Sequence, residues 1–157
     1  MPDFNPNLAA NSAITEVLPK DEYMLTVFEP KAYSRKFNDK TTGAEVEIIG
    51  VRYPMKVTDG NHSGKRVFPE FSLNNDAGLG AFKRFLMATL GFEPTADGER
   101  KFNEQYGSID YNINPDTGHL GDAYRLVTGK VVYCILDSRT TDGKEYQSYK
   151  TWRRTNG

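Results

Sequence analysis

The sequence lacks several features that whole classes of protein require. Its 157 residues include one cysteine, Cys134, which excludes an internal disulfide and a zinc site built from several cysteines. So little cysteine suits a reducing compartment. No apolar run is long enough to span a bilayer and no signal peptide opens the chain, so we expect a cytoplasmic protein with no membrane association.

Motifs that hold phosphate or calcium are also missing. The stretch "GNHSGKR" at residues 60–66 is one residue shorter than a phosphate P-loop, has Arg66 in place of the hydroxyl, and leads into a predicted strand. The stretch "DYNINPDTGHLGD" at residues 110–122 places oxygen side chains at alternate positions, as calcium loops do. However, Pro115 replaces the glycine of the sharp turn and Gly121 replaces the bidentate glutamate. We interpret both stretches as ordinary turns.

Side chains that perform catalysis do not gather in any motif. His62 and His119 lie in separate predicted turns, and Cys134 lies in the apolar run "VVYCIL", which is typical of a buried thiol. No nucleophile signature such as G-x-S-x-G occurs. We therefore expect no enzymatic activity, no metal and no cofactor.

The net charge of −1 conceals an uneven distribution. Residues 31–73 carry eight Lys/Arg and five Asp/Glu, or +3, and residues 123–157 carry seven and three, or +4. Residues 92–122 carry two and seven, or −5. The two basic segments are also those with strand-like patterns, so the chain is able to present one positive face despite its balanced total.

Alternating apolar residues predict strands over 22–37, 44–57, 65–73, 123–139 and 145–154, separated by glycine-containing turns. Gly50 suggests a bulge or bend, and Pro69 places the third strand at an edge. Residues 76–91 have helical spacing, with Asn75 or Asp76 as the N-cap and Gly91 as the end, and residues 98–106 suggest a short helix. Residues 1–19 are expected to be irregular.

The order strand, strand, strand, helix, strand, strand predicts a mainly β protein. It is the order of the five-stranded OB barrel, in which one helix packs between strands three and four. We expect a single OB-like domain over residues 1–157, with residues 92–122 as an acidic connector or insertion before strand four. A rolled sheet with one packed helix is the alternative.

Basic and aromatic residues recur together on the predicted strands and on the turns that join them. Lys and Arg replace the counterions of phosphates, and aromatic faces stack on the exposed bases of single strands. An OB barrel binds across strands two and three and the two loops beside them. The same residue types are also normal on any solvent-facing sheet. The residues that we predict to bind nucleic acid are Tyr33, Arg35, Lys36, Phe37, Arg52, Lys56, Lys65, Arg66, Phe68, Arg139, Lys144, Tyr146, Tyr149, Lys150 and Trp152.

Five stretches resemble a family of small phage-encoded proteins. They are "DFNPN" (3–7), "LPKDEYMLTV" (18–27, with Asp21 in place of the usual glycine), "KVTDGNHSGKRVFPEFSL" (56–73), "LGAFKRFLMATLG" (79–91) and the closing hairpin at 126–152. The family occurs among phage replication and recombination genes and is associated with OB folds that bind single-stranded DNA. The resemblance implies a non-enzymatic protein of this kind in the cytoplasm of the host cell.

Several alternatives stay open at this point. Single-stranded RNA is an alternative to single-stranded DNA, because phosphate contacts and base stacking suit both. The domain is alternatively a protein-interaction module that contacts phage or host replication and recombination proteins. Open sheet edges often pair, which makes a homodimer a further hypothesis. The acidic residues 92–122 are a partner contact, an internal competitor for DNA, or a solvated insertion.

Overall fold

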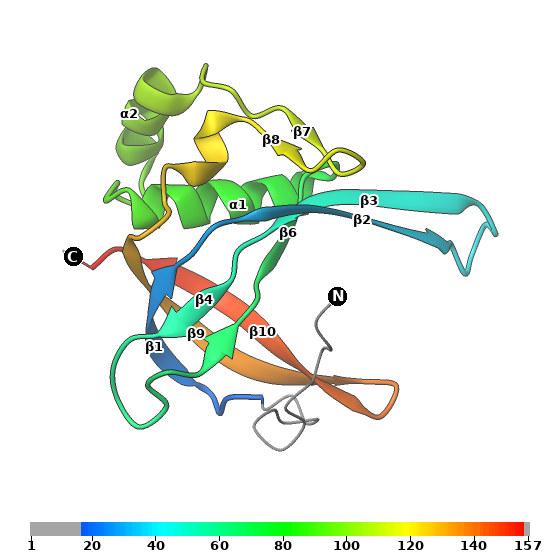
Figure 1. Cartoon of the computed structure of the whole chain (residues 1–157), viewed down its shortest axis with the longest axis horizontal. Helices are drawn as coiled ribbons and strands as arrows, with labels where there is room; N and C mark the ends of the chain where they lie inside the picture. The colour runs from blue at the N-terminus through cyan, green and yellow to red at the C-terminus, as the bar shows by residue number, and fades with distance from the viewer. Residues whose placement is uncertain (1–16, 156–157) are drawn as a thin grey trace, which may run out of the picture.

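The computed structural model describes residues 17–155 and is mainly β (Figure 1). The expectation for residues 1–16, including the "DFNPN" motif, lies outside the described residues. None of the helices within 17–155 is long and apolar enough to cross a membrane. In chain order the elements are β1 Asp21–Val27, β2 Lys31–Asn38, β3 Glu45–Arg52, β4 Met55–Val57, β5 Arg66–Val67, β6 Glu70–Ser72, α1 Asp76–Thr89, α2 Ala96–Tyr106, β7 Ile113–Asn114, β8 His119–Leu120, the short 3-10 helix η1 Asp122–Arg125, β9 Val131–Thr141 and β10 Lys144–Arg153.

A proline divides each of the first three predicted strands in two. The breaks at Pro30, Pro54 and Pro69 separate β1 from β2, β3 from β4 and β5 from β6. Proline has no N–H to donate to a ladder, so regular pairing stops there. Backbone bonds still link the corners, because the Phe28 N–H donates to the Pro54 carbonyl at 2.9 Å and the Tyr53 N–H to the Pro69 carbonyl at 3.0 Å. At each proline the chain passes from one sheet to the other.

Two open sheets form the body of the molecule. The larger has the order β10-β9-β1-β4-β5 and the smaller β2-β3-β6, while β7 and β8 make a separate small hairpin. Within the described residues, no ladder joins β5 or β6 to β10, so the expected closed barrel is not confirmed. Side chains of β10 bridge this gap instead. The Tyr149 hydroxyl accepts a hydrogen bond from the backbone N–H of Phe68 at 3.2 Å, and the Trp152 ring lies 5.8 Å from the Phe71 ring.

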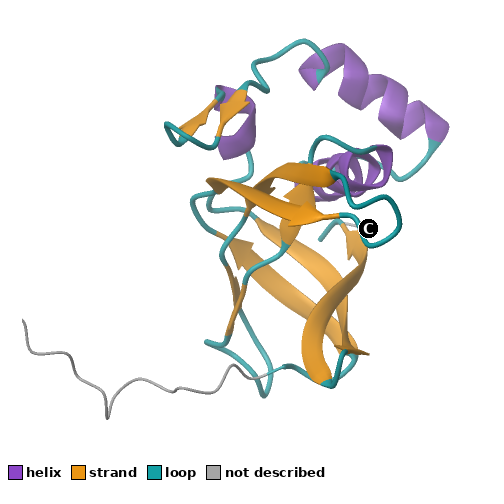
Figure 2. Cartoon of the chain, turned by 90° about the vertical axis from the view of Figure 1, so that its right-hand side faces the viewer, coloured by secondary structure: helices purple, strands orange, loops and turns teal. Residues whose placement is uncertain are grey.

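The predicted helix forms where its sequence signals lie. The Asn75 side chain accepts a hydrogen bond from the Gly78 N–H at 2.8 Å, and α1 ends before Gly91, whose φ of +87° favours glycine. Both helices lie at the same end of the sheets (Figure 2). Phe82 and Phe85 of α1 are buried against core aromatics that include Tyr53, which lies between β3 and β4.

The acidic segment folds onto α1 and contributes to the core. Its α2 confirms the short helix predicted over 98–106. Phe102 is buried and meets Phe92 edge-on, with ring centroids 5.5 Å apart. The acids stay at the surface, where Asp97 accepts a hydrogen bond from Arg100 at 2.7 Å. Residues 92–122 are therefore not a purely solvated insertion, because their aromatic side chains pack into the core.

The bulge that we predicted at Gly50 is wrong. Gly50 pairs regularly with Tyr33 on one side and Ser72 on the other, and the strand bends at Pro54 instead. A Cβ at position 50 would lie 2.5 Å from the Tyr33 ring and from the Phe71 carbonyl oxygen. Glycine is present because these groups approach the backbone closely.

Candidate nucleic-acid interface

The sheet β2-β3-β6 turns one face outward. Cross-strand partners share a face, and the register pairs Tyr33 with Gly50, Arg35 with Ile48, and Phe37 with Val46. The neighbouring pair, Val51 and Phe71, is buried and marks the inner face. Predicted residues Tyr33, Arg35, Phe37 and Arg52 therefore lie together on the outer face.

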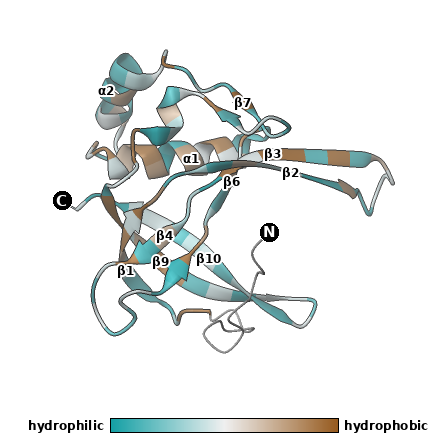
Figure 3. Ribbon diagram, viewed as in Figure 1, coloured by the Kyte–Doolittle hydropathy of each residue, from teal (hydrophilic) through white to brown (hydrophobic). Residues whose placement is uncertain are grey.

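The β2-β3 hairpin extends from the body as an arm, with apolar segments of β3 along it (Figure 3). Near its end, Phe37 is 48% exposed and lies opposite Val46. Lys36 points to the other face of the arm, where its amine is 4.0 Å from the Glu45 carboxylate. The structure therefore separates Lys36 from the other three predicted residues of β2, because alternate residues of a strand face opposite ways.

Glu70 sits between two of the predicted arginines. Its carboxylate accepts two hydrogen bonds from Arg35, both at 2.7 Å, and two from Arg52, at 2.9 and 2.6 Å. The hydrogen bonds to Glu70 raise the pKa of Arg35. The cluster Arg35–Glu70–Arg52 thus carries a net +1 rather than +2, and both guanidinium groups are held in fixed positions.

Tyr33 forms the floor of this cluster. The Arg35 and Arg52 guanidinium carbons lie 5.0 and 6.0 Å from its ring centroid. The ring is half-buried over Gly50, and burial raises the pKa of its phenol. An aromatic ring, two cations and one anion therefore share a compact site on the outer face.

A second group of predicted residues lies on β4-β5. Lys56 and Arg66 are cross-strand partners on the outer face, opposite the buried pair Met55 and Val67. The Arg66 guanidinium lies 5.4 Å from the centroid of the Phe28 ring. Lys65 precedes Arg66 at the end of the β4-β5 turn, which confirms that "TDGNHSG" joins two strands.

The consecutive strands β5 and β6, which lie in different sheets, connect the two groups along the chain. In this stretch, Arg66 and Phe68 are exposed and Glu70 faces outward beside them. Phe68 is 50% exposed, so part of its side chain is accessible to a ligand. We use the name cationic face for the outward residues of β4 and β5 in one sheet, of β2, β3 and β6 in the other, and of the chain that joins them. It consists of Tyr33, Arg35, Phe37, Arg52, Lys56, Lys65, Arg66, Phe68 and Glu70.

The tip of the β9-β10 hairpin carries a third group. Tyr146 lies opposite Arg139, whose guanidinium is 5.8 Å from the Tyr146 ring centroid, and the ring is 43% exposed. Lys144 follows the turn at Asp142 and Gly143, both of which have positive φ. The tip and the arm project from the same side of the molecule (Figure 1).

The structure does not bring Tyr149 and Trp152 to this surface. Both pair with core residues, Tyr149 with Leu136 and Trp152 with Cys134, so both rings turn inward. They stack in parallel at 6.2 Å, and Trp152 also meets Phe85 edge-on at 4.8 Å. Burial raises the pKa of the Tyr149 phenol. Lys150, between them, lies near the opposite end of β10 from the tip.

The sequence prediction lacks Glu70, which lies on the cationic face, and Phe28, whose ring contacts Arg66 of that face. The alternation in "KRVFPEF" could have predicted that Glu70 faces outward. Val67 and Phe71 point inward, so position 70 points to the opposite face. Phe28 had no comparable signal, since its contact with Arg66 joins residues far apart in the chain.

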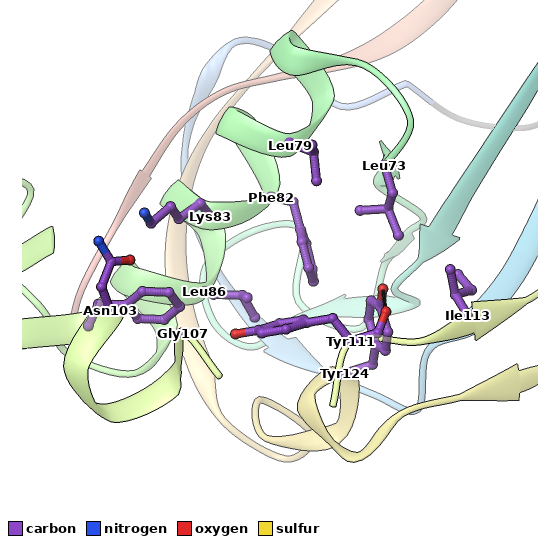
Figure 4. A pocket seen from close by; sticks show the side chains of 11 residues that line it. Leu73, Leu79, Phe82, Lys83, Leu86, Asn103, Gly107, Tyr111, Ile113 and Tyr124 are labelled. Carbon is purple, nitrogen blue, oxygen red and sulfur yellow. Dashed lines mark hydrogen bonds between the residues drawn. The ribbon is translucent and has the colours of Figure 1, made fainter. Parts of the chain in front are cut away.

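A cavity of about 410 Å³ lies away from this face, between α1 and the segment from α2 to η1 (Figure 4). Leu86, Phe102 and Tyr124 are among the apolar side chains of its walls. The Tyr124 and Tyr111 hydroxyls donate to backbone carbonyls at 2.8 and 2.9 Å. These two hydroxyls are thus committed to the fold. Nowhere in residues 17–155 do three or more His, Cys, Asp or Glu side chains gather as a metal site would require.

Comparison with protein-family models and with curated proteins gives no match to this chain. The proposed function is therefore based on the geometry of the cationic face.

Proposed function

We propose that this protein binds single-stranded DNA, without strong sequence preference, across the cationic face and the β9-β10 tip. We infer further that the two sheets are halves of an OB-type barrel that is open between β5-β6 and β10. In this arrangement the first predicted strand pairs with both the second and the fourth, and the binding surface lies on strands two and three with the adjoining hairpins.

The observation that supports this proposal most is the repeated pairing of arginine with an aromatic ring on outward strands. Arg35 and Arg52 lie over Tyr33, and Arg139 lies over Tyr146. Guanidinium groups neutralise phosphates, and exposed rings such as Phe37 stack on bases. A duplex hides its base faces, so this combination favours single strands.

The phage-family resemblance described above suggests where such binding is used. We propose a role in phage DNA replication or recombination, in which the protein coats single strands.

Fluorescence anisotropy with labelled oligo(dT) tests the proposal, with duplex DNA and oligo(U) as competitors. We expect saturable binding to oligo(dT) that weakens linearly with the logarithm of salt concentration. Equal competition by oligo(U) would extend the ligand class to RNA. No binding at low salt, or preferential binding of the duplex, would refute the proposal.

A matched pair of variants tests the face itself. Phe68→Ala removes an exposed ring of the cationic face, whereas Leu79→Ala removes a side chain of similar exposure (46% against 50%) on α1. Loss of one stacking contact costs about 1–3 kcal/mol, or roughly 5- to 150-fold in Kd. We expect this loss for Phe68→Ala and an unchanged Kd for Leu79→Ala. Equal Kd values for the two variants would remove Phe68 from the binding surface.

A further inference from the structure

A second cavity, of about 450 Å³, lies where α1 and β10 end. This is the end of the molecule marked by the C-terminus in Figure 1, away from the arm and the β9-β10 tip. We call it the C-terminal pocket. Four cationic side chains line it, and no carboxylate is among its lining residues. The cations are Arg84, Lys150, Arg153 and Arg154, and the other lining residues are Met87, Ala88, Phe92, Pro94, Thr151 and Trp152.

Two of the four cationic side chains make no hydrogen bond or ion pair within the described residues. Arg153 is paired with Glu22 at 2.7 Å, and Arg154 donates to the Gly91 carbonyl at 3.2 Å and lies 3.6 Å from Glu93. In contrast, neither Arg84 nor Lys150 has a hydrogen bond or ion pair of its side chain within residues 17–155, and both are exposed. The rim of the pocket therefore offers positive charge to an anionic ligand.

The floor of the pocket is suited to an aliphatic or aromatic side chain rather than to a stacked base. Met87, Ala88 and Pro94 present aliphatic atoms, and methionine adapts readily to different partners. The aromatic rings are already engaged, because Trp152 stacks on Tyr149 and Phe92 contacts Phe102 edge-on. A base would need a free ring face for its stacking energy.

The geometry points to a docking site for an acidic segment of a partner protein. We propose that an apolar side chain of this segment enters the C-terminal pocket while carboxylates on either side of it pair with Arg84 and Lys150. The position of the pocket, at the other end of β10 from the tip, allows such a partner to bind while the cationic face holds a single strand.

Fluorescence polarisation with a labelled heptapeptide, Asp-Asp-Glu-Phe-Leu-Asp-Asp, tests this inference on the full chain. A peptide with serine at both apolar positions keeps the charge and serves as a control. Burial of one large apolar side chain contributes about 1.5–3 kcal/mol, so we expect the control peptide to bind at least about tenfold more weakly. No saturable binding of the first peptide, or equal binding of both, would overturn the inference.

Two charge reversals locate the site by opposite effects. Arg84→Glu should weaken peptide binding about tenfold or more and leave the Kd for oligo(dT) unchanged, whereas Lys144→Glu should do the reverse. Lys150→Glu provides a second test of the pocket if circular dichroism shows that Arg84→Glu is misfolded. If Arg84→Glu weakens oligo(dT) and spares the peptide, the pocket belongs to the nucleic-acid surface and the inference is wrong. Peptide binding without any oligo(dT) binding would refute the proposed function alone.

Discussion

Glu70 places an anion in the middle of a surface that we propose to bind a polyanion, and its removal makes the sharpest prediction. The substitution Glu70→Gln keeps the size of the side chain and removes its charge. Arg35 and Arg52, which now share one carboxylate through four hydrogen bonds, would regain a full +2 charge. We therefore expect this variant to bind single-stranded DNA more tightly than the unmodified protein does.

The magnitude follows from the exposure of the cluster. The side chains of Arg35 and Arg52 are 54% and 42% exposed and that of Glu70 is 22% exposed, so the interaction is screened by water. One charge about 4 Å from a phosphate in water is worth about 1 kcal/mol, which is roughly fivefold in Kd. Each additional phosphate contact also makes the slope of log K against log salt steeper by about 0.7.

The assay is anisotropy with labelled oligo(dT) over a series of salt concentrations, and the control is Glu47→Gln. Glu47 of β3 is the cross-strand partner of Lys36 and lies on the other face of the sheet β2-β3-β6 from Glu70. Its substitution changes the net charge equally. We expect Glu70→Gln to lower Kd about fivefold at low salt while Glu47→Gln has a much smaller effect. A Kd that rises in Glu70→Gln would show that the carboxylate positions the arginines for binding. Equal changes in both variants would show that phosphates do not reach this cluster.

Three further predictions concern the body of the fold. Trp152 is the single tryptophan and packs against Phe85, so saturating oligo(dT) should leave its emission nearly unchanged; strong quenching would place the ring at the DNA. Gly50→Ala forces a Cβ against the Tyr33 ring and should lower the free energy of unfolding by about 1–3 kcal/mol in urea titrations, whereas an unchanged midpoint would mean that the ring moves freely. Burial raises the pKa of the Cys134 thiol to about 12, so a thiol reagent at pH 8 should react only as the protein unfolds. Because the unfolded thiol ionises first, its contribution to stability is present below pH 9 and is lost as the pH rises toward 12, which urea titrations at several pH values would detect.

Local signals predicted most of the elements correctly. The helical spacing over 76–91, the Asn75 cap and the Gly91 stop each depend on residues close together in the chain, and all three are confirmed. The strand predictions are wrong over residues 123–130, where the short helix η1 and a turn at Gly129 (φ +82°) precede β9, which begins only at Val131. Each of the first three predicted strands forms as two strands. The prolines that divide them can be seen in the sequence. The sheet that each half joins cannot, because it depends on partner strands elsewhere in the chain.

The candidate site was predicted less well on strand β10. Simple alternation places Tyr149 and Trp152 on opposite faces, because they are three residues apart. The register shifts between Tyr149 and Thr151, with Lys150 as the extra residue, and this bulge turns both rings toward the core. No local sequence pattern predicts this bulge, and the contact of Trp152 with Phe85 that accompanies it joins residues far apart in the chain.

The sequence by itself determined that the chain is mainly β, where its helix begins and ends, and that its positive charge lies on the strands. Those properties follow from residue types and their spacing over short distances. Only the tertiary structure decided that the sheets stay open, that Glu70 holds Arg35 and Arg52, and which aromatic rings face solvent. Each of these depends on contacts between residues distant in the chain, whose partners are fixed by packing and not by local pattern.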